Sequence, residues 1–349
     1  MNAAAQKRQG ELSGLTLPTS LEGVPGSRRA RSVGIGRAHA KAILLGEHAV
    51  VYGAPALALP IPQLTATASA GWSTPTGDAQ GELSFTMTGS ASRAVVTWAS
   101  DGLRQLTHAF KERMGITGTR HLDVILDGAI PLGRGLGSSA AHSRAIVMAL
   151  ADLFDRELDR STAFELVQTA ENVAHGRASG VDAMAVGAAA PLRFQAGQAR
   201  DLTVGCEGLF ILADSGTAGS TKEAVQLLRS GFQREAGAQE RFLRRATRLV
   251  DAAEVALADG RSERLGALLT AYHELMRAAG LSTDRIDAMV EGALKAGSLG
   301  AKITGGGLGG CVLALTQPEQ AREVARQLHE AGAVQTWVVP LRRVADHAL

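Results

Sequence analysis

The chain has 349 residues, 45% of them hydrophobic, so it is long enough to bury a full core and to form two lobes. Its 36 Lys and Arg residues barely outnumber 34 Asp and Glu residues, which leaves no overall field to attract nucleic acid or an anionic membrane. Only two cysteines are present, far apart and without a CxxC or His-rich neighbourhood, so neither a disulfide framework nor a zinc site is indicated. We therefore expect a cytoplasmic protein whose partners are small molecules.

The first half of the chain predicts a solvated tail followed by mixed strands and helices. Residues 1–31 are polar and lack the apolar stretch of a signal peptide, and no later apolar run approaches the roughly 18 residues of a membrane-spanning helix. Apolar runs and alternation then predict strands at 40–45, 55–59, 64–70 and 121–126, and a helix at 103–114. A glycine-rich loop at 128–137 leads into a helix beginning at Ser138, and the next helix has Thr162 as its expected cap with Glu165 three residues on.

The second half predicts helices and then strands around a second glycine cluster. A strand at 209–213 precedes three or four helices between residues 221 and 296. The closing elements are a strand, a glycine cluster, a strand, a helix and a strand, at 301–304, 305–310, 311–315, 316–332 and 334–339. Thr316 with Glu319 is the expected cap of the last helix.

Strands and helices that alternate without a regular βαβ cadence predict an α+β fold in both halves. The two halves are expected to meet between Leu192 and Gly208. We therefore predict a flexible tail at 1–31, an N-terminal lobe that binds ATP and phosphate at 32–200, and a C-terminal lobe at 201–349.

Residues 131–141, PLGRGLGSSAA, predict an anion site because a glycine-rich loop runs into the start of a helix. Glycine lets the backbone approach an oxyanion closely, and the first helical turn has unpaired N–H groups that favour phosphate. The segment is not a Walker loop, which requires a Lys that is absent here. Ser138 and Ser139 offer hydroxyl ligands for Mg²⁺. The alternative is a glycine-rich connection that only reverses the chain.

Glu171 and Asp182 form a second candidate constellation, since glycines at 176 and 180 are expected to bend the chain between them. Such a bend would place one carboxylate to hold a metal and the other to receive a proton, although solvated or capping carboxylates are the alternative. Lys41 lies in an apolar strand, where it either extends to water or is held beside an acidic group or a phosphate. His48 is either structural or functional.

Gly305, Gly307 and Gly310 form a GxGxxG pattern, which raises a dinucleotide-binding fold as an alternative interpretation of the chain. The pattern leads into the strand-like run 311–315, whereas a Rossmann unit needs a helix there. We therefore expect a loop that packs closely on a ligand or on the other lobe.

Three segments, taken together and in this order, resemble the signature motifs of the GHMP small-molecule kinases. They are 41–53 (KAILLGEHAVVYG), 131–141 and 302–311 (KITGGGLGGC). The GEHAVVYG part, supported by 175–182 and 214–222, is similar to the branch of the family that acts on mevalonate rather than galactose, in its actinobacterial type. This resemblance covers 33–339. It implies a two-lobed fold, with an N-terminal lobe like ribosomal protein S5 domain 2, a ferredoxin-like C-terminal lobe and ligands between them.

The resemblance also implies the reaction: transfer of the γ-phosphoryl group of ATP, with Mg²⁺, to the 5-hydroxyl of mevalonate on the route to isoprenoids. Asp182 falls at the catalytic base, Lys41 at the lysine that contacts that base and the acceptor hydroxyl, and Ser139 and Glu171 at the Mg²⁺ ligands. The nucleotide-binding positions are Pro131, Gly133, Arg134, Gly135, Leu136, Gly137, Ser138, Ser139 and Ala140. The acceptor-binding positions are Lys41, Glu47, His48, Asp182, Thr221 and Gly306.

The chain departs from the family pattern at a few positions. His39-Ala40 replaces the usual Pro-Gly, while Arg134 and Leu308 stand where small residues are common. The rivals within the family, phosphomevalonate kinase and diphosphomevalonate decarboxylase, should need additional Lys or Arg around the acceptor. A catalytically silent relative that senses a ligand is disfavoured because Lys41, Glu171 and Asp182 are all retained. The sequence leaves open the residues that hold adenine, inhibition by isoprenoid diphosphates, and the pairing of subunits into a homodimer.

Overall fold

The computed structural model describes residues 32–72, 83–89, 93–117, 120–176 and 178–341. The predicted tail at 1–31 lies outside these residues. Within the described ranges, no helix has both the length and the apolar character needed to cross a membrane.

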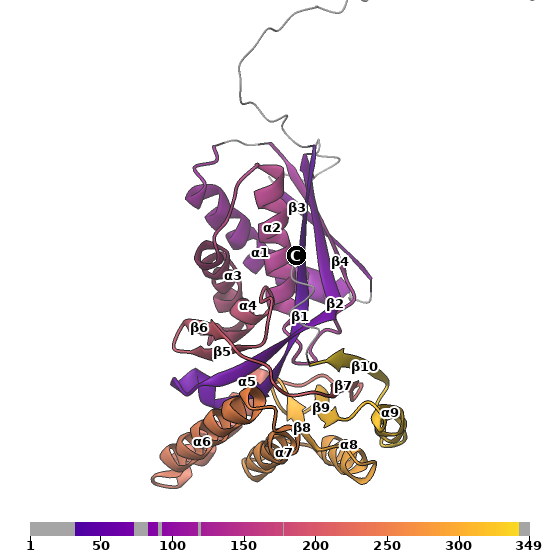
Figure 1. The fold of residues 1–349 in the computed structure, drawn as a ribbon. Helices are drawn as coiled ribbons and strands as arrows, with labels where there is room; N and C mark the ends of the chain where they lie inside the picture. Colours follow the sequence, from indigo (N-terminus) through magenta and orange to yellow (C-terminus); the bar gives the residue numbers. More distant parts are fainter. Residues whose placement is uncertain (1–31, 73–82, 90–92, 118–119, 177, 342–349) are drawn as a thin grey trace, which may run out of the picture. The chain divides into compact units, whose positions relative to one another are not determined.

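The first half of the chain builds a six-stranded sheet with helices on one side (Figure 1). Its strands are β1 (Val33–Leu45), β2 (Ala56–Trp72), β3 (Leu83–Gly89), β4 (Leu122–Gly128), β5 (Leu192–Gln195) and β6 (Gln198–Asp201). Their order is β3-β4-β2-β5-β6, with β1 also paired to β2, and only the β3–β4 pair is parallel. The helices are α1 (Arg93–Arg113), α2 (Ser138–Leu153), α3 (Arg160–His175) and α4 (Val181–Ala185), and a 3-10 turn, η1 (Ala49–Tyr52), follows β1.

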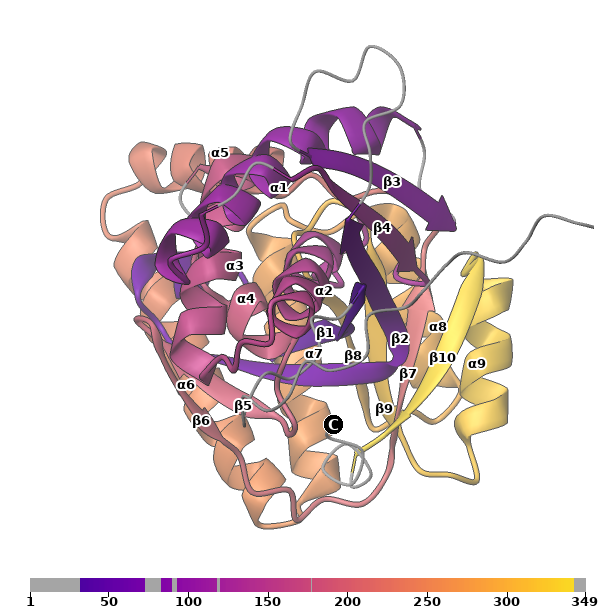
Figure 2. The same ribbon diagram turned by 90° about the horizontal axis from the view of Figure 1, so that it is seen from above.

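Helix α2 packs directly on the backbone of β1, and Figure 2 shows it lying over that strand. Gly34 and Gly36 of β1 permit this approach, because an added Cβ would lie 2.2 Å from the carbonyl oxygen of Ala149 and 2.0 Å from that of Ala145. The facing residues of α2 are small alanines, so the helix and the strand interlock without a gap. This contact sets the start of α2, where the glycine-rich loop ends, relative to the strand that carries Lys41.

The second half builds a four-stranded antiparallel sheet in the order β10-β7-β9-β8. Its strands are β7 (Leu209–Asp214), β8 (Gly300–Thr304), β9 (Cys311–Thr316) and β10 (Gln335–Pro340). The helices α5 (Thr221–Arg234), α6 (Ala238–Ala258), α7 (Ser262–Ala278) and α8 (Asp284–Lys295) connect β7 to β8, and α9 (Ala321–Glu330) connects β9 to β10. This order of strands and connections is the ferredoxin-like arrangement, so the predicted α+β fold with that second lobe is confirmed. The first sheet ends at Asp201 and the second begins at Leu209; the lobe boundary at residue 200 stays a prediction.

Two predicted helix caps are wrong. The N-cap of α3 is Asp159, whose side chain accepts a hydrogen bond of 2.6 Å from the N–H of Thr162. Thr162 therefore donates to the cap and is not the cap itself. Thr316 is the last residue of β9, where it pairs with Leu209, and α9 begins only at Ala321. In both cases the Thr-x-x-Glu pattern is present but does not cap a helix. At α3 the side chain of Asp159 caps the helix instead, and Thr316 is held in the sheet by its partner strand.

Short elements were missed: strand β3, the β5–β6 hairpin and α4 do not appear among the expected elements. Strand β6, QARD, is polar and mostly exposed, so it lacks an apolar periodicity and its pairing with β5 determines its structure. Strand β3, LSFTMTG, does alternate apolar and polar residues, so a strand signal was present there.

Candidate active site

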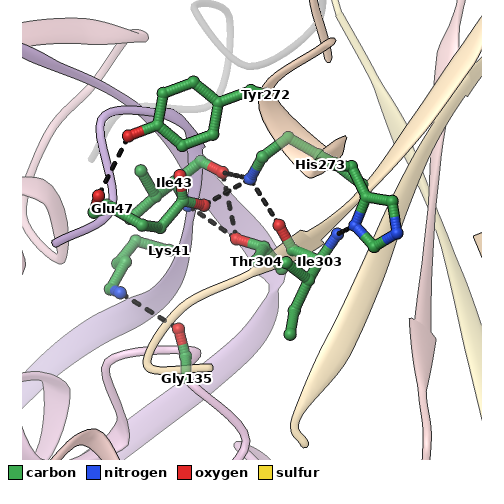
Figure 3. Close-up of polar contacts among 9 residues, drawn as sticks. Lys41, Ile43, Glu47, Gly135, Tyr272, His273, Ile303 and Thr304 are labelled. Atoms are coloured by element: carbon green, nitrogen blue, oxygen red, sulfur yellow. Dashed lines mark hydrogen bonds and ion pairs between the residues drawn. The ribbon is translucent and has the colours of Figure 1, made fainter. Parts of the chain in front are cut away.

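The side chains of Lys41 and Asp182 meet as expected. Lys41 lies near the middle of β1 with its side chain only 3% exposed, and its Nζ is 3.0 Å from Oδ1 of Asp182. The same Nζ donates a hydrogen bond of 3.0 Å to the carbonyl oxygen of Gly135 (Figure 3). Asp182, expected in a loop, lies instead in the first turn of α4, which Gly180 starts with a left-handed φ of 94°. A glycine is needed there because other residues adopt this conformation only at a cost.

Two cavities adjoin at this pair. The larger cavity has a volume of about 930 Å³ and is lined by all six predicted acceptor positions: Lys41, Glu47, His48, Asp182, Thr221 and Gly306. The smaller cavity, about 600 Å³, is lined by residues of the glycine-rich loop and the start of α2, namely Gly133, Gly135, Gly137, Ser138 and Ser139. Glu171 and Asp182 line both cavities. The Lys41–Asp182 pair therefore lies where a group could pass from one cavity to the other.

The glycine-rich loop has the backbone that an anion site requires. Gly133, Gly135 and Gly137 have φ values of 68°, 74° and 70°, and Gly137 is the residue from which α2 starts. The N–H groups of the first turn of α2 therefore face the smaller cavity without partners from within the helix. The other predicted nucleotide-binding positions, Pro131, Arg134, Leu136 and Ala140, do not line either cavity as the described residues define it, and Leu136 and Ala140 are buried in the core.

The second glycine cluster, residues 305–310 between β8 and β9, packs against this loop. A Cβ added at Gly135 would lie 2.8 Å from Cα of Gly305, so the two loops touch backbone to backbone. The segment connects two antiparallel strands, which excludes the strand-to-helix geometry of a dinucleotide-binding fold. The expectation of a loop packed closely on the other half of the molecule is confirmed.

A buried ion pair joins the turn after β1 to β8. The ammonium of Lys302, with a fully buried side chain, contacts the carboxylate of Glu47 and donates to the carbonyl oxygens of Ile43, at 3.2 Å, and Ile303. Tyr272 donates a hydrogen bond of 2.9 Å to the backbone carbonyl of Glu47 (Figure 3). Burial raises the pKa of Glu47 and lowers the pKa of Lys302, while their attraction opposes both shifts. Glu47 therefore lines the larger cavity, as predicted, but its charge is already matched.

His48 is held in an uncommon conformation beside the same cavity. Its φ is 60°, and it is 6% exposed. Burial, with a smaller contribution from the charge of Lys302, lowers its pKa to about 4. The imidazole is therefore neutral near pH 7, where it offers one donor and one acceptor rather than a positive charge.

The two predicted metal ligands face a common space. Glu171 on α3 is 4% exposed, and Ser139 belongs to the first turn of α2; both line the smaller cavity together with Asp182. Across the described ranges, no group of three or more His, Cys, Asp or Glu side chains is placed to hold a metal. One or two carboxylates and a hydroxyl nonetheless suit Mg²⁺, which keeps several waters and takes its remaining ligands from phosphates.

Two departures from the family pattern have structural partners. The ring of His39 is within 3.0 Å of the carbonyl oxygen of Ala188 and also contacts that of Ala40, so it ties β1 to the end of α4. Arg134 points away from both cavities, and its Nε is 2.7 Å from Oδ1 of Asp214.

Helix α5 contributes two cations that sequence reasoning did not treat together. Lys222 and Arg229 both line the larger cavity, and Lys222 lines the smaller cavity as well. They are seven residues apart, which places them on one face of the helix. Neither side chain forms an ion pair among the residues that the structure describes. The seven-residue spacing of the two cations was the signal in the sequence that could have identified them as a pair.

Comparison with known proteins agrees with this geometry. Residues 102–189 match the family description "GHMP kinases N terminal domain", and residues 253–334 match "GHMP kinases C terminal". A mevalonate kinase from Thermococcus sibiricus is 32% identical over 327 residues, which cover 85% of this chain and 93% of that protein.

Solved structures show the same fold. The Leishmania major mevalonate kinase in complex with R-mevalonate aligns with a TM-score of 0.76 at 23% identity, covering 90% of this chain and 98% of that one. The mevalonate kinase from methicillin-resistant Staphylococcus aureus MRSA252 aligns with a TM-score of 0.67 at 28% identity, covering 89% and 99%. With its loops, its two adjoining cavities and both family domains in place, this chain belongs to the GHMP kinases.

Proposed function

We propose that the chain transfers the γ-phosphoryl group of ATP to the 5-hydroxyl of mevalonate, giving 5-phosphomevalonate for isoprenoid synthesis. The observation that carries this proposal is the Lys41–Asp182 pair, 3.0 Å apart at the junction of the two cavities. ATP would place its phosphates in the smaller cavity against the start of α2. The acceptor would occupy the larger cavity. Similarity to a mevalonate kinase over most of both chains supports the choice of acceptor.

The mechanism follows from the positions of the charges. The γ-phosphoryl group passes through a loose transition state whose charge is spread over its oxygens, so position and electrostatics provide most of the catalysis. Asp182 would accept the hydroxyl proton late, as the new O–P bond forms, because a carboxylate is a weak base toward a free alcohol. Lys41 holds that carboxylate in place and would stabilise the developing alkoxide.

Mg²⁺ belongs to this proposal as the ion that neutralises the phosphate oxygens. Ser139 and Glu171 would hold it, since a hydroxyl and a buried carboxylate line the cavity in which the phosphates are placed. A cytoplasmic location is also part of the proposal, and it is supported by two cysteines that are both buried and free.

The charge of the larger cavity supports an anionic acceptor and not a neutral one. Lys222 and Arg229 are exposed on one face of α5 and line the larger cavity. Lys222 also lines the smaller cavity, whereas Arg229 does not, so Arg229 can meet a carboxylate at the end of the acceptor remote from its reacting hydroxyl. The charge of Glu47 is already matched by Lys302 and would not repel that carboxylate. A neutral sugar would leave the two cations without a partner.

The experiment is a coupled assay of ADP release with purified protein, ATP and Mg²⁺ across four acceptors: mevalonate, phosphomevalonate, galactose and homoserine. We expect turnover with mevalonate alone. The control is Asp201→Asn, which changes an exposed carboxylate on β6 that is remote from both cavities. Comparable kcat/KM values for galactose or phosphomevalonate would contradict the assigned acceptor. No turnover with any of the four would contradict the proposed reaction.

A further inference from the structure

Arg134 is the one charged residue in the glycine-rich loop, and its side chain reaches the other half of the molecule. Its Nε lies 2.7 Å from Oδ1 of Asp214, at the end of β7, and its Nη2 donates 2.9 Å to the carbonyl oxygen of Gly216. The two side chains are 18% and 7% exposed, so solvent screens this ion pair far less than a pair on the surface. Asp214 is itself fixed by a 2.8 Å hydrogen bond from the N–H of Gly216.

Backbone contacts reinforce the same junction. The N–H of Gly219 donates 2.9 Å to the carbonyl oxygen of Gly133, and a Cβ added at Gly310 would lie 2.8 Å from the carbonyl oxygen of Arg134. The segment from Asp214 to Gly219 continues within two residues into Thr221, at the start of α5. The loop that faces the smaller cavity is therefore joined to the segment that leads to the larger one.

The glycine-rich loop needs such a support. Three of its residues, Gly133, Gly135 and Gly137, have positive φ values, and glycine gains the most freedom of any residue when a segment is released. A loop that moves in the free protein must be ordered when an anion binds, which weakens binding. A charged side chain anchored outside the cavity favours the ordered loop before an anion binds, and a ligand on either side of the anchor can order it further.

We propose that Arg134 is a positioning residue: through Asp214 it holds the phosphate-binding loop in its binding conformation and couples that loop to the start of α5. It does not contact the nucleotide. ATP and the acceptor therefore strengthen each other's binding through this tether, and by thermodynamic linkage the effect is equal in both directions. The coupling to the acceptor rests on the proposed function, whereas the effect on the nucleotide does not.

The test measures by calorimetry the Kd of the non-hydrolysable ATP analogue AMPPNP with Mg²⁺, so that no phosphoryl transfer occurs during the titration. It is measured first without and then with saturating mevalonate, for the wild type, Arg134→Ala, Asp214→Asn and the double variant. Without mevalonate, we expect each single variant to weaken nucleotide binding about five- to tenfold, the size expected when one partly buried ion pair is lost. The double variant should be no weaker than the weaker single variant, because both substitutions remove one contact. Mevalonate should tighten nucleotide binding in the wild type and do so less in the variants.

Two controls keep these outcomes decisive. Arg160→Ala removes an exposed pair with Asp201, 3.6 Å apart, and should leave both Kd values unchanged. Arg134→Lys keeps the charge and should restore part of the affinity, which general damage to the fold would not allow. An unchanged Kd in Arg134→Ala, or additive losses in the double variant, would overturn the tether. Absence of turnover with mevalonate would instead count against the proposed function alone, since ATP binding is measured without it.

Discussion

Replacing Lys302 by Met should destabilise the protein far more than the loss of a surface charge. Lys302 is fully buried, and its three ammonium protons meet three acceptors: the carboxylate of Glu47 and the carbonyl oxygens of Ile43 and Ile303. The Met variant leaves a buried carboxylate without its counter-charge. Breaking a buried pair in this way costs about 3–5 kcal/mol of unfolding free energy.

The assay is urea unfolding followed by far-UV circular dichroism, with the slope m compared between variants. Lys295→Met is the matched control, since Lys295 is 78% exposed and pairs with Glu291 on the surface, where the cost should stay below about 1 kcal/mol. Adding Glu47→Gln to Lys302→Met removes the stranded charge and should recover at least about 1 kcal/mol.

The pH dependence of that loss has a definite sign. Burial already raises the pKa of Glu47 from its ordinary value of 4.5, and without Lys302 it should rise further. A raised carboxyl pKa destabilises the fold above the unfolded pKa, so the deficit of Lys302→Met relative to the wild type should be larger at pH 8 than at pH 5. A deficit below about 1 kcal/mol at pH 8, or one that grows on acidification, would refute the reasoning.

Three further predictions concern the cavities and the acid side of the stability curve. Arg229→Ala should raise the KM for mevalonate about tenfold and leave the Kd of ATP nearly unchanged, because Arg229 lines the larger cavity and not the smaller one. Steady-state kinetics and calorimetry would show this, and an unchanged KM would remove Arg229 from acceptor recognition. Gly135→Ala should abolish ATP binding, because φ of Gly135 is 74° and the new Cβ would lie 2.8 Å from Cα of Gly305. The control Gly231→Ala in α5, whose Cβ would have no atom within 4 Å, should raise the unfolding free energy in urea by about 0.5–1 kcal/mol. Burial lowers the pKa of His142 to about 4, so the folded state resists protonation of this residue and the unfolding free energy should fall as pH drops from 6.5 toward 4. His142→Gln should reduce the slope of this fall by up to about 1.4 kcal/mol per pH unit, and a slope identical to that of the wild type would contradict the prediction.

Local sequence signals were sufficient for the parts of the site that lie within one short segment. The glycines of 131–141 and the apolar spacing after them predicted a loop that ends where α2 begins, and α2 does begin at Ser138. The glycines at 176 and 180 predicted a bend between Glu171 and Asp182, and the two carboxylates line the same cavities. In each case the residue type restricts the backbone itself, so no distant partner is needed to read the pattern.

The contacts that depend on distant partners could not be predicted in this way. Glu47 and Lys302 are 255 residues apart, and the run around each is apolar enough that either charge could have extended to water. Arg134 was expected either at the nucleotide or in solvent, and its partner Asp214 lies at the end of a strand in the other sheet. Pairing of this kind depends on how the two halves pack, which periodicity and spacing do not encode.

The most direct test of the account is turnover by Asp182→Asn, measured beside the binding of ATP to the same variant. Asparagine keeps the size of the side chain and removes the carboxylate that would accept the proton, and the exposed fraction of 36% leaves room for the change without loss of the fold. The account predicts that kcat with mevalonate falls by at least about a thousandfold while the Kd of ATP changes less than about fivefold. A variant with near-normal kcat would show that Asp182 is not the base.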